Sequence, residues 1–241
     1  MSKVLSEGHR GYCAKYPENT LVSFRAALTA GVDAMEFDVW LSKDGVPVIM
    51  HDGNAWRTCG VDRKLQDMTL EEIKALDAGK KFDEKFAGEQ VPTLREVLQL
   101  ARELRPDIML GVEIKQYTEE TCDKTVAMLK EFGFFDTCIF YCFSTRVIKY
   151  LKQRHQARTM GYPDFQMSEF EPDSYSYYDE IGLNMRIMRS EIFDVYRRKG
   201  FKMHMYCADT EQDVREAIEK GASLITANEI EPLLRVLAEQ E

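Results

Sequence analysis

Residues 34–39 read Ala-Met-Glu-Phe-Asp-Val, a stretch in which acidic and apolar side chains alternate. Side chains along a β-strand point to opposite faces in turn, so Glu36 and Asp38 share one face and the apolar residues share the other. A salt-bridge ladder on a fully exposed strand is disfavoured because its second face would expose apolar groups to water. The pattern therefore predicts a strand of an α/β barrel, with its apolar face on the helices and both carboxylates inside.

The same period of two recurs in residues 110–115, which read Leu-Gly-Val-Glu-Ile-Lys. It places Glu113 and Lys115 on the inward face, so that Glu113 can join Glu36 and Asp38. Neighbouring buried carboxylates repel one another and lose hydration unless a cation binds between them. Because the set contains no Cys or His, it favours one hard divalent cation, Mg²⁺ or Ca²⁺. Lys115 lies one step nearer the barrel mouth, where it can meet a phosphate oxygen.

Strand-like and helix-like segments alternate through most of the chain, which predicts repeated βα units. Apart from a hairpin strand at Val46–Met50, eight strands are expected, each followed by a helix or an equivalent crossover. Eight such units in 241 residues indicate a closed TIM (βα)8 barrel, with a doubly wound open sheet as the alternative. The whole chain, residues 1–241, is predicted as one barrel domain with a small insertion after the second strand, at about residues 43–92.

Element boundaries follow from hydrophobic periodicity and capping residues. Asn19 is the expected N-cap of the first helix, and the aromatic stretch around Tyr175, Tyr177 and Tyr178 is expected to pack rather than to bind a ligand. The expected strands are Val4–Gly8, Asp33–Leu41, Ile108–Lys115, Thr137–Phe143, Arg158–Tyr162, Glu180–Asn184, 201–207 and 222–226. The expected late helices are 190–198, 211–220 and 230–239.

Composition limits the classes of function. Hydrophobic residues make up 44% of the chain and charged residues 30%, as in ordinary globular proteins. The net charge of −9 argues against a nucleic-acid-binding surface, so an anionic small-molecule substrate would need positive charge from a metal or from a few Lys and Arg side chains. No apolar run could span a bilayer, and residues 1–5 lack the apolar stretch of a signal peptide, so a cytoplasmic protein without a stable membrane anchor is expected. The oligomeric state is left open.

Cysteine spacing argues against a zinc site or a disulfide framework. The chain has no CxxC pair, and most of its six cysteines lie in apolar segments, so reduced and mostly buried thiols are expected. The cysteines are Cys13, Cys59, Cys122, Cys138, Cys142 and Cys207.

His9 and Arg10 stand side by side at the end of the first strand. An Arg side chain forks onto two phosphate oxygens, and a His side chain moves a proton near neutral pH. On its own such a pair is equally compatible with a polar strand-to-loop junction. Close to three inward carboxylates, it indicates phosphate chemistry.

A second histidine reaches the same cluster. His51 ends the hairpin strand that folds back beside Asp38, so His9 and His51 can act as acid and base on opposite sides of a phosphorus atom. The remaining two histidines are weaker candidates. His155 is expected on a solvated helix face, and His204 is expected to fill the barrel interior.

Several further motifs occur in order through the first half of the chain, at regular spacing. They are His9-Arg10-Gly11, Pro17-Glu18-Asn19-Thr20, Glu36-Phe37-Asp38-Val39, residues 44–52, Arg57-Thr58-Cys59-Gly60, residues 68–73, residues 76–79, Val91-Pro92-Thr93-Leu94 and Val112-Glu113-Ile114-Lys115. Together they resemble the signature of the glycerophosphodiester phosphodiesterases, a family of phospholipase C-like TIM barrels.

The resemblance implies a metal-dependent phosphodiesterase that hydrolyses glycerophosphodiesters to glycerol 3-phosphate and an alcohol. The site residues it implies are the metal ligands Glu36, Asp38 and Glu113, the catalytic acid/base pair His9 and His51, and the substrate contacts Arg10, Lys115, Phe143 and Tyr206. It does not choose between Mg²⁺ and Ca²⁺, name the alcohol, or decide between direct attack by water and a cyclic phosphate intermediate.

The second half of the chain departs from the family pattern. Tyr206 stands where a Trp usually lines the glycerol side, and Cys142 stands where Ser usually precedes Phe143. These changes leave the metal site untouched but bear on the shape of the substrate pocket. Two alternatives therefore stay open: a phosphodiesterase of the same fold that acts on lysophospholipids, for which no strongly apolar exposed loop is expected, and a non-catalytic barrel that binds a phosphorylated ligand.

Overall fold

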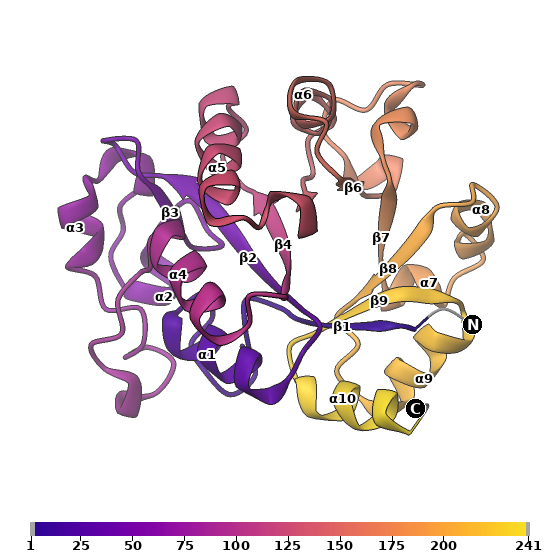
Figure 1. Cartoon of the computed structure of the whole chain (residues 1–241), viewed down its shortest axis with the longest axis horizontal. Coiled ribbons are helices and arrows are strands. Elements are labelled where there is room, and N and C mark those ends of the chain that lie inside the picture. Colours follow the sequence, from indigo (N-terminus) through magenta and orange to yellow (C-terminus); the bar gives the residue numbers. More distant parts are fainter. Residues whose placement is uncertain (1–2, 240–241) are drawn as a thin grey trace.

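The computed structural model of the chain describes residues 3–239. Within these residues one sheet carries nine strands, of which eight run parallel and close into a barrel because β1 pairs with both β9 and β2. The ninth, β3, pairs antiparallel with β2 and lies outside the barrel. The predicted TIM barrel with a hairpin strand is therefore confirmed (Figure 1). The strands are β1 (Leu5–Gly8), β2 (Ala34–Leu41), β3 (Pro47–Ile49), β4 (Met109–Ile114), β5 (Cys138–Tyr141), β6 (Thr159–Gly161), β7 (Glu180–Asn184), β8 (Lys202–Tyr206) and β9 (Ala222–Ala227).

Helices surround the barrel and form connections between successive parallel strands. The helices are α1 (Leu21–Ala30), α2 (Trp56–Cys59), α3 (Leu70–Lys74), α4 (Leu94–Leu104), α5 (Glu119–Phe132), α6 (Thr145–His155), α7 (Met185–Met188), α8 (Phe193–Arg197), α9 (Glu211–Glu219) and α10 (Ile230–Ala238). Short 3₁₀ helices occupy Leu65–Asp67, Glu84–Phe86, Phe135–Thr137, Asp164–Gln166 and Ser174–Tyr177.

Helix α4 shows how the sequence sets these elements. Thr93 accepts a hydrogen bond from the Glu96 amide, and the Glu96 carboxylate accepts one from the Thr93 amide, a capping box that starts the helix. Apolar residues then recur on one face, and each fully buried Leu or Val contributes roughly 1.5–3 kcal/mol. The buried residues are Leu94, Val97, Leu98, Leu100 and Ala101.

Strand β2 has the two faces that its sequence predicts. Met35, Phe37 and Val39 have no exposed surface, and the Phe37 ring meets that of Phe24 on α1 edge-on at 6.2 Å. Because this apolar face packs on the helical layer, Glu36 necessarily points into the barrel.

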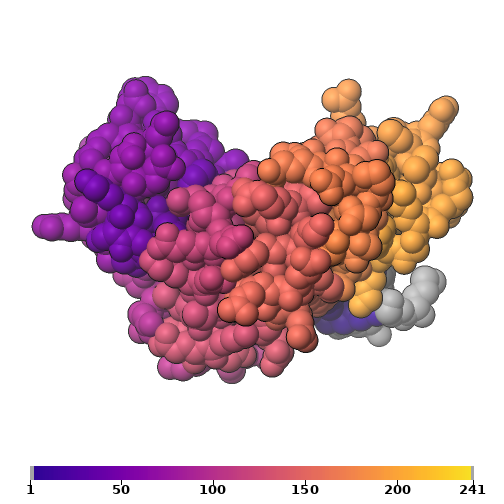
Figure 2. Space-filling view, turned by 90° about the horizontal axis from the view of Figure 1, so that it is seen from above, coloured from indigo at the N-terminus to yellow at the C-terminus, as the bar shows by residue number. Residues whose placement is uncertain are grey.

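The insertion after β2 forms a small layer with its own core. Buried apolar residues of this core run from Val48 in β3 to Val91, with Leu65 and Ile73 between them. In Figure 1 its helices α2 and α3 lie at the opposite end of the long axis from α8. Figure 2 shows the purple residues of this part of the chain as a raised mass, separated by a notch in the outline from the orange residues of the later half.

Two predicted boundaries are wrong. Thr20, not Asn19, caps α1, since its hydroxyl accepts from the Ser23 amide; Asn19 instead has a left-handed backbone with φ of 56°. The helix expected at 190–198 is shorter, since α8 spans Phe193–Arg197, and a short helix that was not expected, α7, precedes it. The Asn184 side chain caps α7 by accepting from the Ile187 amide.

Most predictions about individual residues outside the site agree with the structure. The cysteines, all within the described residues, are free thiols, but only Cys122, Cys138 and Cys142 are buried. Cys13 and Cys59 are half-buried and Cys207 is exposed. Tyr175 and Tyr178 pack on each other and on Phe201, as expected. No helix in residues 3–239 is both long and apolar enough to cross a membrane.

Candidate active site

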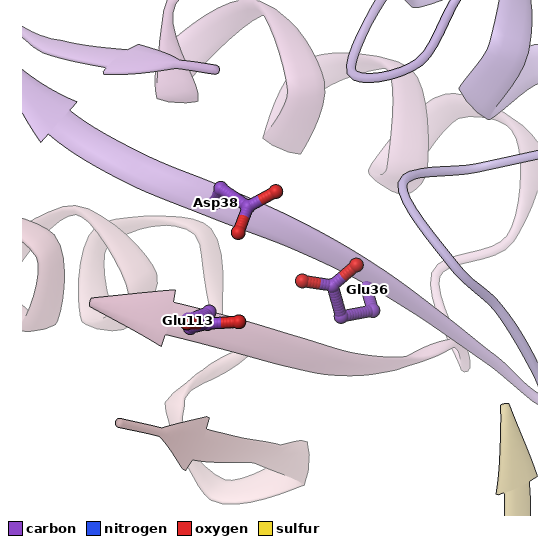
Figure 3. A group of neighbouring side chains, drawn as sticks. All are labelled: Glu36, Asp38 and Glu113. Atoms are coloured by element: carbon purple, nitrogen blue, oxygen red, sulfur yellow. The ribbon is translucent and has the colours of Figure 1, made fainter. Parts of the chain in front are cut away.

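Three carboxylates from two neighbouring barrel strands meet inside the barrel. Strands β2 and β4 pair in a register that sets Asp38 beside Glu113, with Glu36 one step below. One oxygen from each of the three residues lies within 4.8 Å of the others, and all three side chains are buried. Figure 3 shows the carboxylates of Glu36 and Asp38 on one strand facing that of Glu113 on the next.

Burial and mutual repulsion make this cluster costly without a cation. Burial, reinforced by the neighbouring Asp38 and Glu113, raises the pKa of Glu36 well above its ordinary value. Burial and Asp38 likewise raise the pKa of Glu113. Glu36 Oε1 and Asp38 Oδ1 find no hydrogen-bond partner among the residues that the structure describes. An oxygen-only set with two orphaned oxygens fits a hard divalent cation, which would satisfy both atoms and favour the charged forms.

The other carboxylate oxygens are held by hydrogen bonds. The Arg10 amide donates to Glu36 Oε2 at 2.9 Å, and Asn19 Nδ2 donates to Asp38 Oδ2 at 2.8 Å. Lys115 Nζ donates to Glu113 Oε1 at 2.9 Å. These contacts leave Glu36 Oε1 and Asp38 Oδ1 without a hydrogen bond in the described part of the chain. The left-handed backbone of Asn19 directs its side-chain amide at Asp38. This role was not predicted, because Asn19 was expected to cap the first helix.

His9 is held with one ring nitrogen toward the triad. Its Nδ1 lies 2.7 Å from Asn228 Oδ1, and Asn228 Nδ2 donates to Asp209 at 2.8 Å, which fixes the amide so that its oxygen faces the ring. His9 Nδ1 therefore carries a proton, and Nε2 lies 3.9 Å from Glu36 Oε2. Burial, with the adjacent Arg10 charge, lowers the pKa of His9.

His51 faces the same space from the hairpin. Its Nδ1 lies 2.6 Å from Asp52 Oδ1, and because a carboxylate only accepts, Nδ1 is the protonated nitrogen. Nε2 is then free to accept, and Lys115 Nζ lies 3.2 Å from it. Both histidines thus present Nε2 to the pocket, the arrangement that proton transfer to a bound substrate requires.

A pocket of about 210 Å³ opens at the C-terminal ends of the barrel strands, between this polar cluster and an aromatic wall. In that wall Phe143 and Tyr162 stack with ring centroids 3.8 Å apart, and Tyr206 meets Tyr162 edge-on at 5.8 Å. Of the nine predicted site residues, eight line the pocket; Asp38 is fully buried behind Arg10, whose Nε lies 3.5 Å from Asp38 Oδ2.

The pocket floor is a buried polar network that the sequence analysis missed. Glu7 accepts from Tyr141 at 2.9 Å and from Thr226 at 2.7 Å, and His204 Nε2 lies 3.1 Å from the same carboxylate. His204 fills the barrel as predicted, but Glu7 was overlooked although the period of two puts it inward in β1. No pattern singles out Tyr162. The last histidine, His155, is at the end of α6, where Nε2 lies 2.7 Å from an Asp123 oxygen.

Known proteins match the chain over almost its whole length. The model of the glycerophosphoryl diester phosphodiesterase family matches residues 9–231. A glycerophosphodiester phosphodiesterase of Caldanaerobacter subterraneus subsp. tengcongensis is 32% identical over 98% of both chains. The solved structure of a glycerophosphodiester phosphodiesterase from Agrobacterium tumefaciens is 27% identical and superposes with a TM-score of 0.81, over 98% of this chain and 99% of that one.

A more distant structure shares the fold. A phosphodiesterase of Oleispira antarctica, solved in complex with the product sn-glycerol-3-phosphate, is 23% identical and has a TM-score of 0.85, over 98% of this chain and 96% of that one. The barrel, its carboxylate cluster and the match across residues 9–231 agree on one assignment. The chain belongs to the glycerophosphoryl diester phosphodiesterase family.

Proposed function

We propose that the chain hydrolyses glycerophosphodiesters to glycerol 3-phosphate and an alcohol, with one divalent cation, Mg²⁺ or Ca²⁺, at Glu36, Asp38 and Glu113. The observation that carries the proposal is that three buried carboxylates meet beside one pocket that is also lined by two histidines and two cationic side chains. Membership of the family supports the reaction class. The product bound to the Oleispira antarctica phosphodiesterase supports glycerol 3-phosphate as the product here.

The metal and the basic residues would both bind the phosphate group of the substrate. When bound, the cation polarises the phosphoryl oxygens and stabilises the charge of the transition state, which is worth several kcal/mol. Arg10 and Lys115 line the same pocket and donate to the non-bridging oxygens. Their positive charge also offsets the acidic cluster before substrate arrives, since Arg10 pairs with Asp38 and Lys115 pairs with both Glu113 and Asp38.

His9 and His51 carry the protons. In each ring a hydrogen-bond acceptor, Asn228 for His9 and Asp52 for His51, keeps the proton on Nδ1. Nε2 is therefore the nitrogen that exchanges protons with the substrate. One Nε2 takes the proton of the attacking hydroxyl, and the other gives a proton to the oxygen of the departing alcohol. Attack by water completes the hydrolysis with these two transfers. Attack by the glycerol 2-hydroxyl would first give a cyclic phosphate, which water would then open in a second pair of transfers with the roles of the two histidines exchanged.

The aromatic wall forms the rest of the pocket. Phe143 and Tyr206 offer apolar and edge contacts to the glycerol side, and the stacking of Tyr162 on Phe143 holds that ring in place.

A cytoplasmic location is part of the proposal. It is supported by the free thiols, which suit a reducing compartment.

Lysophospholipids are the second candidate substrate, and one observation favours them. Phe165 is 62% exposed and Ile192 is 40% exposed, and the two line a shallow groove together with Gln166. Gln166 Nε2 lies 3.4 Å from the Tyr206 hydroxyl, so the groove adjoins the pocket. No strongly apolar exposed loop was expected from the sequence, and such exposed apolar side chains can accept an acyl chain.

The test has two arms. The first measures release of glycerol 3-phosphate from glycerophosphocholine, glycerophosphoethanolamine and glycerophosphoglycerol, and the second measures formation of lysophosphatidic acid from lysophosphatidylcholine. Each substrate is assayed with EDTA, and then with Mg²⁺ or Ca²⁺ restored. Metal-restored release from the water-soluble diesters establishes the proposal. Turnover of the lysophospholipid alone transfers it to the second candidate, and no turnover of any of them leaves a barrel that only binds a phosphorylated ligand.

A further inference from the structure

One arginine of the insertion lies at the edge of the active site. Arg57, in α2, directs Nε at Asp52 Oδ2 at 2.6 Å. Its Nη1 and Nη2 meet the two oxygens of Glu18, each at 2.7 Å. The Arg57 guanidinium thus links Asp52, which follows the hairpin strand, to Glu18 in the loop after β1. These two segments are far apart in the sequence.

The Asp52 branch of this bridge ends at His51. Asp52 uses Oδ2 for Arg57 and Oδ1 for His51 Nδ1, at 2.6 Å in both cases. Burial raises the pKa of Asp52, but the hydrogen bonds from Arg57 and His51 outweigh it and hold the pKa below its ordinary value. Asp52 therefore stays an ionised acceptor that keeps the His51 proton on Nδ1. Within residues 3–239 the side-chain hydrogen bonds to the Asp52 carboxylate come from His51 and Arg57, so removal of Arg57 would leave Oδ2 without its donor.

The Glu18 branch ends at Arg10. Glu18 Oε1 also accepts from Arg10 Nη1 at 3.0 Å, and Arg10 lies against Asp38 on its other side. Burial raises the pKa of Glu18, but the contacts with Arg57 and Arg10 outweigh it and lower the pKa overall. Glu18 is thus a charged anchor that fixes the direction in which the Arg10 side chain extends.

Arg57 itself does not reach the reacting atoms. The pocket between the triad and the aromatic wall is lined by Arg10 and His51, but not by Arg57. Its three donor nitrogens are directed at Asp52 and Glu18, so it acts on the site only through them. A Lys could form one of these contacts but not the fork, since an ammonium is a single point of charge.

We propose that Arg57 is a positioning residue through which the insertion fixes the tautomer and direction of His51 and the reach of Arg10. The proposal rests on the proposed function for its kinetic consequence, but the state of the His51 ring can be observed without turnover. It gives the insertion a role in the reaction in addition to its own folding.

The variants Arg57→Ala and Arg57→Lys test the proposal, with Arg63→Ala as the matched control. Arg63 is in the same insertion and pairs with Glu72 on the surface, remote from the pocket. Loss of the hydrogen-bond partner that orients a metal-ligating His typically costs roughly tenfold to hundredfold in activity, and we expect a similar loss for the partner that orients His51. We expect that fall in kcat for Arg57→Ala, a several-fold rise in KM as Arg10 loosens, incomplete rescue by Arg57→Lys, and wild-type values for Arg63→Ala.

The decisive readout is the ¹⁵N–¹H spectrum of the imidazole rings in protein labelled at its four histidines. His51, assigned with His51→Ala, should show a protonated Nδ1 in the wild type and in Arg63→Ala, and should move toward a mixture of tautomers in Arg57→Ala. An unchanged His51 ring in Arg57→Ala would overturn the proposal, even if activity fell. If the wild-type protein cleaves no diester, the proposed function is wrong. If the His51 ring spectrum still changes in Arg57→Ala, the positioning role of Arg57 stands.

Discussion

Replacing Glu36 by Gln should stabilise the metal-free protein while removing its response to metal. Glu36 Oε1 is a buried acceptor without a partner, beside two further carboxylates. An amide of the same size would donate to those carboxylates, and its oxygen would keep the hydrogen bond from the Arg10 amide. Removing one unsatisfied buried acceptor is worth roughly 1–3 kcal/mol, which raises Tm by roughly 2–12 °C in a chain of this size.

Metal should stabilise the wild-type protein but have little effect on the Glu36→Gln variant. A ligand at a hundred times its Kd stabilises the fold by about 2.7 kcal/mol, which corresponds to roughly 5–10 °C in Tm. Wild-type protein should gain that increment when Mg²⁺ or Ca²⁺ replaces EDTA at neutral pH, and Glu36→Gln should gain little of it. The assay is thermal unfolding with EDTA and with each metal.

Glu180→Gln is the control for this assay. Glu180 is also buried in the barrel, with 2% of its side chain exposed, but Arg158 pairs with it. Its replacement should lower Tm equally with and without metal. The reasoning is refuted if Glu36→Gln is less stable than wild type in EDTA, or if metal raises its Tm as much as that of the wild type.

Three further outcomes follow from the structure. His51→Ala should abolish turnover while leaving the circular dichroism spectrum and Tm near wild type, and normal turnover would rule out its proton-transfer role. Gly111→Ala should cost roughly 1–3 kcal/mol in urea unfolding, because a Cβ there would lie 2.5 Å from the Glu7 carboxylate; unchanged stability would contradict that packing. Burial raises the pKa of Asp33, but hydrogen bonds from Ser6 outweigh it and lower the pKa overall. Its stabilisation is therefore present above the unfolded value of about 3.9 and lost as pH falls through the folded one. Asp33→Asn should be less stable than wild type at pH 7, and the gap in urea midpoint should close in acid.

The barrel and the acidic triad could be predicted because both follow from local periodicity. The alternation around Phe37 separates an apolar face from an acidic one within a single strand, and the same alternation around Val112 repeats it in the next. Parallel pairing of β2 with β4 then brings the acidic faces together. Nothing beyond strand geometry is needed, so this part of the site is encoded residue by residue.

The supporting residues could not be found this way because they act across the fold. Asn19 has the residue type of a helix cap, and only the three-dimensional path of the loop shows that it serves Asp38. Arg57 contacts Glu18, 39 positions earlier in the chain, and no period links the two. Asn228 holds His9 across the closure of the barrel, where β1 meets β9. Such contacts depend on the tertiary arrangement of loops, which carries little local signal.

The most direct test of metal-dependent hydrolysis at the triad is a titration. Release of glycerol 3-phosphate from the preferred diester is measured as Mg²⁺ or Ca²⁺ is added back to EDTA-treated protein, with Glu113→Gln in parallel. Wild-type activity should rise from near zero to a plateau, and the variant should need far more metal or remain inactive. Full activity in EDTA, or identical curves for both proteins, would contradict a catalytic metal bound by these carboxylates.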